Sequence, residues 1–239
     1  VFEVTSDKYK RIKSVLEANP KKYTQTKLAR LRYRPEFLQV IDKINSREYE
    51  AMACLVLELL GAKKVRLTPT GNEAGIDFIG LIEFGADAHF LFGTNGPIRI
   101  IGQSKMYQTE IQVNAIKEFN QTLLDVYSLT DKVKTVVPHW FRQAKGPIIG
   151  WMISHEGFQT GAIDRAKNYG IICSDSKDIS ELICCSRKFQ NGTASIDRPR
   201  KLKSEIDRII NDIEINNKNC AQQHLRKHGA DSDKRQVRA

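Results

Sequence analysis

Apolar residues recur every three or four positions in several stretches of the chain, which is the spacing of one helix face. In the first such stretch of the central region we expect a helix from Ser46, its cap, to Leu60, with Gly61 as its stop. Its apolar positions are Tyr49, Met52, Ala53, Val56 and Leu60. Further helices are predicted over Val113–Tyr127, over Gln159–Asn168 and from near Asp178. Each of them should lie with one side on a hydrophobic core.

Short β-type segments separate these helices. We predict strands at Lys64–Leu67, Ile76–Glu83, Ile98–Ser104, Pro147–Ile153 and Ile171–Cys173. The second and third are joined by a loop that contains Asn95-Gly96, so antiparallel pairing is expected. Pro147–Ile153 lacks polar alternation, which is typical of a strand buried on both faces. The later strand–helix–strand–helix order predicts a parallel part. The expected fold is therefore α/β, with a mixed central sheet flanked by helices.

The two flanks differ from this central region. In the N-terminal flank, Asn19-Pro20 and Arg34-Pro35 interrupt a helical pattern, which predicts two short helices and a third near Glu36–Lys43. We divide the chain into residues 1–45, a basic helical arm or a remnant of a DNA-binding module; residues 46–190, the core; and residues 191–239. This last segment should hold a basic helix, Leu202–Ile215, followed by a flexible, partly disordered tail.

Charge is distributed unevenly over the 239 residues, whose formal net charge is +10. Residues 1–47 contain twelve basic and five acidic residues, and residues 197–239 contain eleven and seven. The part between them, with fifteen basic and sixteen acidic residues, is nearly neutral. Basic ends on a neutral body are typical of proteins that bind nucleic acid, because Lys and Arg gain affinity by releasing counterions from phosphates. Solvated charged faces would give the same composition.

Several protein classes are excluded by the sequence. The longest apolar run, near residues 51–60, is interrupted by Glu58 and is far shorter than the roughly 20 residues that span a bilayer, so we expect no membrane partner. No secretory signal pattern is visible. The five cysteines are odd in number and form no C-x-x-C pair, which favours a reducing cytoplasm over a disulfide framework or a zinc site.

Three polar residues on two predicted neighbouring strands carry the candidate chemistry. Asp77 follows a glycine-containing loop and lies among Ile76, Phe78 and Ile79, where a lone buried carboxylate would be costly. Gln103 and Lys105 are two residues apart on the next strand and so project from one face. If the strands pair, an acid, an amide and an amine converge. Such a group suits Mg²⁺-dependent phosphodiester hydrolysis, although a structural Asp77–Lys105 ion pair is the alternative.

The same positions carry a family resemblance. Tyr49-Glu50, Gly75-Ile76-Asp77 and Gln103-Ser104-Lys105 resemble the helix, loop-strand and strand motifs of the Mrr-type restriction endonucleases, a branch of the PD-(D/E)XK nuclease superfamily. A later pattern of Ile153-Ser154, Phe158, Ala162, Ala166 and Gly170-Ile171 is also similar to that family. The resemblance covers about residues 46–185 and implies a restriction-endonuclease-like core.

Carried over position by position, the resemblance implies a role for each candidate. Asp77 would be the main metal ligand, Gln103 the second ligand, Glu50 an additional helix carboxylate and Lys105 the catalytic lysine. Glu73 is an auxiliary candidate in the loop before Asp77. Tyr49 stands where the family usually has Phe. The insertion between the two site strands, with Asp87 and His89, is longer than expected and could contact DNA.

The function expected from these features is a Mg²⁺-dependent DNA endonuclease, as the cleavage domain or subunit of a restriction enzyme. Its partner would be double-stranded DNA, held at the phosphates by the basic ends. Cutting both strands would require a homodimer or a partner subunit. Two alternatives remain at this stage: a non-catalytic DNA-binding or assembly module with a nuclease fold, and a structure-selective nuclease that resolves DNA junctions.

Overall fold

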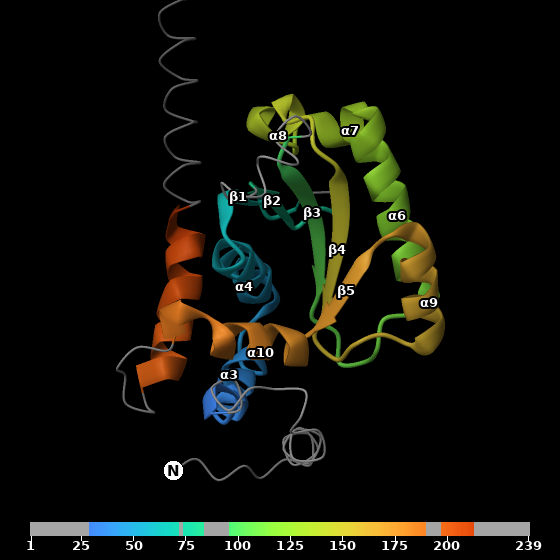
Figure 1. Ribbon diagram of the computed structural model, residues 1–239. Helices are drawn as coiled ribbons and strands as arrows, with labels where there is room; N and C mark the ends of the chain where they lie inside the picture. The colour runs from blue at the N-terminus through green and yellow to red at the C-terminus, as the bar shows by residue number, and fades with distance from the viewer. Residues whose placement is uncertain (1–28, 72–73, 84–95, 190–196, 213–239) are drawn as a thin grey trace, which may run out of the picture.

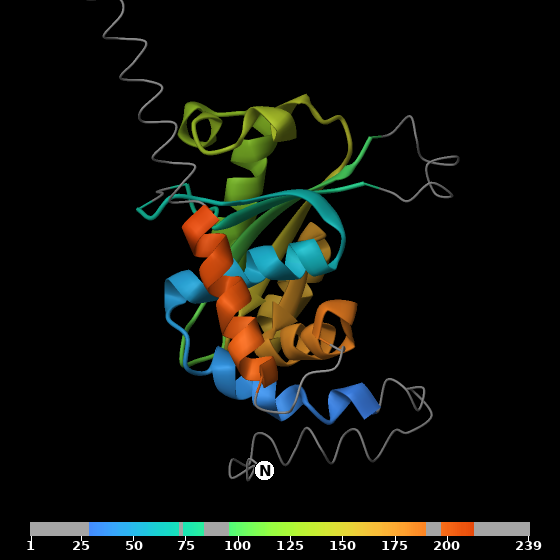
Figure 2. The ribbon, with the colours of Figure 1, turned by 90° about the vertical axis from the view of Figure 1, so that its left-hand side faces the viewer.

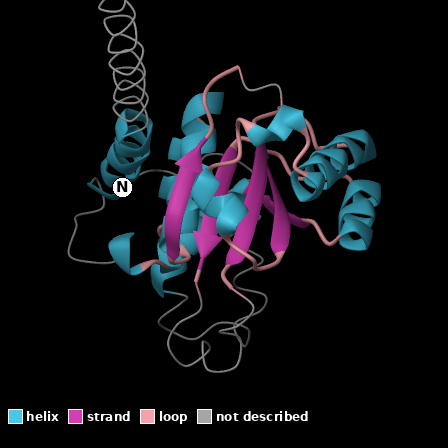
Figure 3. Cartoon of the chain, turned by 90° about the horizontal axis from the view of Figure 1, so that it is seen from above, coloured by secondary structure: helices cyan, strands magenta, loops and turns pink. Residues whose placement is uncertain are grey.

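A five-stranded sheet separates two layers of helices in the computed structural model, which describes residues 29–71, 74–83, 96–189 and 197–212 (Figures 1 and 3). The strands, in their order across the sheet, are β1 (Ala62–Leu67), β2 (Phe78–Ile82), β3 (Ile98–Lys105), β4 (Ile148–Ser154) and β5 (Ile172–Asp175). The β1–β2 and β2–β3 pairs are antiparallel, whereas β3–β4 and β4–β5 are parallel. The predicted mixed sheet is therefore confirmed.

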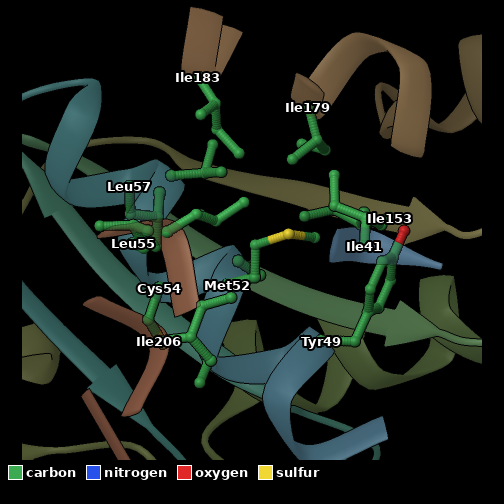
Figure 4. Close-up of a cluster of buried hydrophobic side chains, with 14 of the residues drawn as sticks. Ile41, Tyr49, Met52, Cys54, Leu55, Leu57, Ile153, Ile179, Ile183 and Ile206 are labelled. Atoms are coloured by element: carbon green, nitrogen blue, oxygen red, sulfur yellow. The ribbon is translucent and has the colours of Figure 1, made fainter. Parts of the chain in front are cut away.

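Helix α4 (Ser46–Leu59) is the central element of one layer. Its buried residues point in every direction around its axis, because α4 packs between the sheet and an outer set of helices. The outer set consists of α3 (Arg34–Ile41), α10 (Ser176–Cys185) and the helix over residues 197–212. Figure 4 shows Ile179 and Ile183 of α10 directed toward Met52 and Leu55 of α4. The predicted core helix is thus confirmed, except that Leu60 is 46% exposed.

The N-terminus of α4 begins one residue earlier than the sequence pattern indicated. Asn45, and not Ser46, is the cap: its side chain accepts the Glu48 N–H at 3.0 Å, while the Glu48 carboxylate accepts the Asn45 N–H at 2.8 Å. This reciprocal capping box satisfies two N–H groups that a helix end leaves unpaired. At the other end Gly61 has a φ of +89°, a conformation that glycine adopts without strain.

The second layer covers the opposite face of the sheet. It contains α6 (Val113–Ser128), α7 (Asp131–Lys134), α8 (His139–Gln143) and α9 (Thr160–Tyr169). Strand β4 contributes Trp151 and Ile153 to the core on the α4 side and Ile148 and Met152 to the core on the α6 side, as expected for a strand covered on both faces. Helices α7 and α8 were not predicted, because four or five residues are too few to show a helical period.

The helix over residues 197–212 is attached to α4 by apolar and charged contacts. Leu202 and Ile206 are fully buried in the same cluster as α4. Lys203 forms an ion pair with Glu48 near one end of α4, and Arg208 pairs with Glu58 near the other. Figure 2 shows the helix, in orange to red, crossing α4. It extends from residue 197, five residues before the predicted start at Leu202.

Some predictions lie outside the described residues. These concern the two short helices before residue 29, the auxiliary candidate Glu73, the insertion residues Asp87 and His89, and the tail after residue 212. Among the described residues, no helix is both long enough and apolar enough to cross a membrane.

Candidate active site

Asp77 lies one residue before β2, where the antiparallel ladder between β2 and β3 continues for one more hydrogen bond. Its N–H donates to the Gly102 carbonyl at 2.9 Å. Its side chain accepts the Ser104 N–H at 2.7 Å through Oδ2, and the Ser104 hydroxyl is 3.3 Å from the same oxygen. The strand begins at Phe78, two residues later than predicted. Asp77 is therefore held by β3 at its main chain and at one carboxylate oxygen.

Gly102 allows this close pairing of the two strands. A Cβ atom at Gly102 would lie 1.9 Å from the ring of Phe78, the residue next to Asp77 that is fully buried. Any larger residue at position 102 would displace the Phe78 ring and with it the strand that carries Asp77.

Gln103 lies opposite Asp77 at the end of β3. Its Nε2 donates to the Gly75 carbonyl at 3.0 Å. Because a carbonyl oxygen only accepts hydrogen bonds, the amide must present its NH₂ group to Gly75, so its Oε1 points away from that carbonyl within the amide plane. Gly75 has a φ of +70°, and a Cβ there would be 3.3 Å from Gln103 Nε2. The glycine before the site thus sets the orientation of the amide.

Lys105 is the last residue of β3 and follows Gln103 on the same face. Its carbonyl accepts the His155 N–H at 3.0 Å, and it pairs with Ser154 in the parallel register of β3 and β4. Its ammonium nitrogen is 5.8 Å from the centre of the Tyr107 ring. Strand β4 therefore fixes the main chain of Lys105. Among the described residues Lys105 forms no direct ion pair with Asp77, although its charge acts on that carboxylate.

Glu50 reaches the site from the first turns of α4. Its Oε2 is 2.7 Å from Nη1 of Arg47, three residues earlier on the same helix. The Glu50 side chain is 24% exposed and that of Arg47 is 25% exposed, so this pair is about three-quarters buried. The ion pair formed by Glu50 is thus with Arg47 of its own helix.

The electrostatics of these residues show that they influence one another. Burial raises the pKa of Asp77 above its ordinary value, while the Ser104 N–H and the charge of Lys105 act in the opposite direction. Burial also raises the pKa of Glu50; the Arg47 hydrogen bond opposes this rise and the charge of Asp77 adds to it. Two carboxylates that are buried and repel each other are disfavoured in their charged form, and a cation between them would reverse this effect.

The oxygen atoms of this group fit a hard divalent cation. Asp77 and Glu50 each have one carboxylate oxygen engaged, and Gln103 has its NH₂ engaged, so one oxygen of each remains for a ligand. Carboxylate and amide oxygens are the ligands that Mg²⁺ and Ca²⁺ prefer. No group of three or more His, Cys, Asp or Glu side chains suitable for a metal occurs among the described residues, because the third oxygen here belongs to an amide.

Two residues at the site were not identified by the sequence motifs. Ser104 was given no role of its own within its motif, yet its N–H and hydroxyl hold Asp77. Arg47 was counted only as part of the basic arm, yet it contacts Glu50. The available signal was its position: a basic residue in the first turn of a helix is opposed by the helix dipole.

Residues 41–183 match the family model Mrr_cat, described as a restriction endonuclease. This range contains all four candidate residues and every strand of the sheet. No curated protein matches the chain.

Three solved structures have a related arrangement of elements. The MspJI restriction endonuclease in complex with a 27-mer oligonucleotide is 18% identical over 73% of this chain and 35% of its own, with a TM-score of 0.48. The DNA modification-dependent restriction endonuclease AspBHI is 19% identical over 80% of this chain and 43% of its own, with a TM-score of 0.45. The protein of unknown function AF1548 is 12% identical over 69% and 98%, with a TM-score of 0.40. The chain therefore spans less than half the length of the two restriction enzymes.

Proposed function

Because the chain belongs to the Mrr-type restriction endonuclease family, we propose that it is a DNA endonuclease that hydrolyses phosphodiester bonds with the help of Mg²⁺. The observation that supports this proposal is the mutual influence of Glu50 on α4, Asp77 just before β2 and Lys105 on β3. Gln103 lies two residues before Lys105 on β3. The substrate is double-stranded DNA. Cleavage of both strands requires two such sites, supplied by a second copy of the chain or by a partner subunit.

Each residue has a task in this reaction. Asp77, Glu50 and Gln103 would hold the cation through the oxygens that their present contacts leave available. The cation, when bound, supplies a Lewis acid that polarises the scissile phosphate. Lys105 orients the attacking water and stabilises the negative charge that develops on the phosphate oxygens as the bond to the leaving oxygen breaks. Ser104 and Gly75 keep Asp77 and Gln103 in place for these tasks.

A plasmid cleavage assay with Mg²⁺ tests the proposal. Asp77→Ala and Lys105→Ala should each reduce the cleavage rate about 10²-fold or more, because one removes a ligand and the other removes a charge that acts in the transition state. Lys134→Ala is the matched control, since Lys134 pairs with Asp131 on α7, and its rate should equal that of the unaltered protein.

DNA binding, measured separately by gel shift, distinguishes the outcomes. Lost cleavage with retained binding supports the assignment, whereas cleavage that persists in both variants contradicts it. Binding without cleavage in the unaltered protein would favour the non-catalytic module. Faster cleavage of a four-way junction than of a linear duplex would favour the junction-resolving nuclease.

A further inference from the structure

Arg47 occupies a place beside the proposed metal ligands that none of the roles above uses. Its guanidinium is 2.7 Å from Oε2 of Glu50, and both side chains are three-quarters buried, with 25% and 24% exposed. Burial raises the pKa of Asp77 and of Glu50, and the charge of Arg47 opposes that rise in both. One cationic side chain therefore acts on both carboxylates that would hold the divalent cation.

The position of Arg47 in α4 is unfavourable for the helix itself. The N-terminal end of a helix carries a partial positive charge, so a cation in the first turn is disfavoured. The N-terminus of α4 already has its favourable partners in Asn45 and Glu48, and Glu48 in turn pairs with Lys203. Capping and helix stability thus give no reason for an arginine at this position, whereas the contact with Glu50 does.

The side-chain charges of the metal-free site cancel without a bound divalent cation. Asp77 and Glu50 carry two negative charges, Gln103 is neutral, and Arg47 and Lys105 carry two positive charges. We propose that Arg47 is an internal competitor of the divalent cation, which engages Glu50 in the metal-free protein and lowers the affinity of the site for metal. This inference rests on the proposed metal-dependent nuclease function.

A consequence is that the protein alone binds the metal weakly, and that the negative charge of a DNA phosphate favours metal binding. Removing one positive charge a few ångströms from a divalent ion at a partly hydrated site strengthens binding about tenfold at low ionic strength, since the repulsion is about 1.4 kcal/mol. A structural brace that merely holds Glu50 in position would give the opposite result, because its removal would weaken metal binding.

The experiment measures binding of Mn²⁺, as a probe for Mg²⁺, to the full chain without DNA, by isothermal titration calorimetry at low salt. Arg47→Gln keeps hydrogen-bonding capacity but removes the charge, and we expect it to lower the dissociation constant about tenfold. Arg47→Lys keeps the charge and should bind as the unaltered protein does. Lys134→Ala removes a cation that also pairs with a carboxylate three residues away, but on α7, and should change nothing. Thermal melting of each variant verifies that it is folded.

Asp77→Ala in each background separates this inference from the function on which it rests. Binding that depends on Asp77 and tightens in Arg47→Gln supports the competitor role. Binding that depends on Asp77 but is unchanged or weaker in Arg47→Gln overturns that role and leaves the nuclease assignment intact. Absence of Asp77-dependent binding both in the unaltered protein and in Arg47→Gln overturns the metal site itself.

Discussion

At the scale of single residues, the site combines side chains whose charged forms the fold disfavours. The raised pKa values of Asp77 and Glu50 mean that the folded, metal-free protein holds protons on these carboxyls more tightly than the unfolded chain does. Their contribution to the free energy of unfolding is therefore unfavourable at neutral pH. It vanishes as the pH falls below the ordinary values of 3.8 and 4.5.

Asp77→Asn tests this balance. Asparagine keeps an oxygen that can accept the Ser104 N–H but removes the buried charge. In the presence of a chelator we expect the variant to be more stable than the unaltered protein at pH 7 and equally stable at pH 3. Urea unfolding at both pH values provides the measurement, with the exposed Asp164→Asn of α9 as control. A variant that is less stable at pH 7 would show that the charge of Asp77 is favourably paired.

At the scale of elements, α4 depends on the helix over residues 197–212 for one of its sides. Ile206 is fully buried against α4, as Figure 4 shows, so Ile206→Ala should lower the free energy of unfolding by about 2–4 kcal/mol. Ile210, one turn further along, is only partly buried, and Ile210→Ala should cost clearly less. Denaturant unfolding measures both. Equal losses would mean that the helix does not complete the core.

The sequence predicted elements well where spacing and the order of neighbouring segments carry the information. The helix over 46–60, the antiparallel β2–β3 pair and the parallel part of the sheet all followed from spacing and order. Spacing did not predict which side of a helix is covered when a distant element covers it. The apolar residues Leu124 and Tyr127 of α6 are 49% and 58% exposed, while Val126 is buried.

The site residues divide in the same way, into those that sequence spacing predicts and those that depend on how the strands pair. The residues Asp77, Gln103 and Lys105 could be selected because two strands adjacent in sequence carry them. The Arg47–Glu50 contact could have been noticed from the spacing of three residues in a helix. The hydrogen bond from Ser104 to Asp77 could not, because it depends on how far the ladder extends past the last paired residues.

At the scale of the whole molecule, the described part of the C-terminal basic end already uses several of its charges within the protein. Within residues 197–212, Arg198 pairs with Glu36, and Lys203 and Arg208 pair with carboxylates of α4. Cations that are already paired release few counterions on binding DNA. We therefore propose that other basic residues contact the phosphates, among them Lys21 and Lys22 of the N-terminal basic end.

The salt dependence of DNA binding tests this assignment. Lys21→Ala should reduce the slope of log affinity against log salt concentration by about 0.9, the effect of one lost phosphate contact. Lys203→Ala should leave the slope unchanged, since its ammonium pairs with Glu48 and Asp207. Fluorescence anisotropy with a labelled duplex at several salt concentrations gives both slopes. A smaller slope for Lys203→Ala alone would contradict this assignment and would indicate that the helix over residues 197–212 contacts the DNA.

The packing of α4 between the sheet and the outer helices determines when, during folding, the proposed site is complete. Glu50 lies near Asp77 only while α4 packs on β2 and β3. The main chain of Lys105 is fixed only after β4 has paired with β3, and helices α6, α7 and α8 separate these two strands in the sequence. These are late, long-range steps of folding. A nascent or partly denatured form of the nuclease proposed above would therefore lack the assembled site and should not cleave DNA.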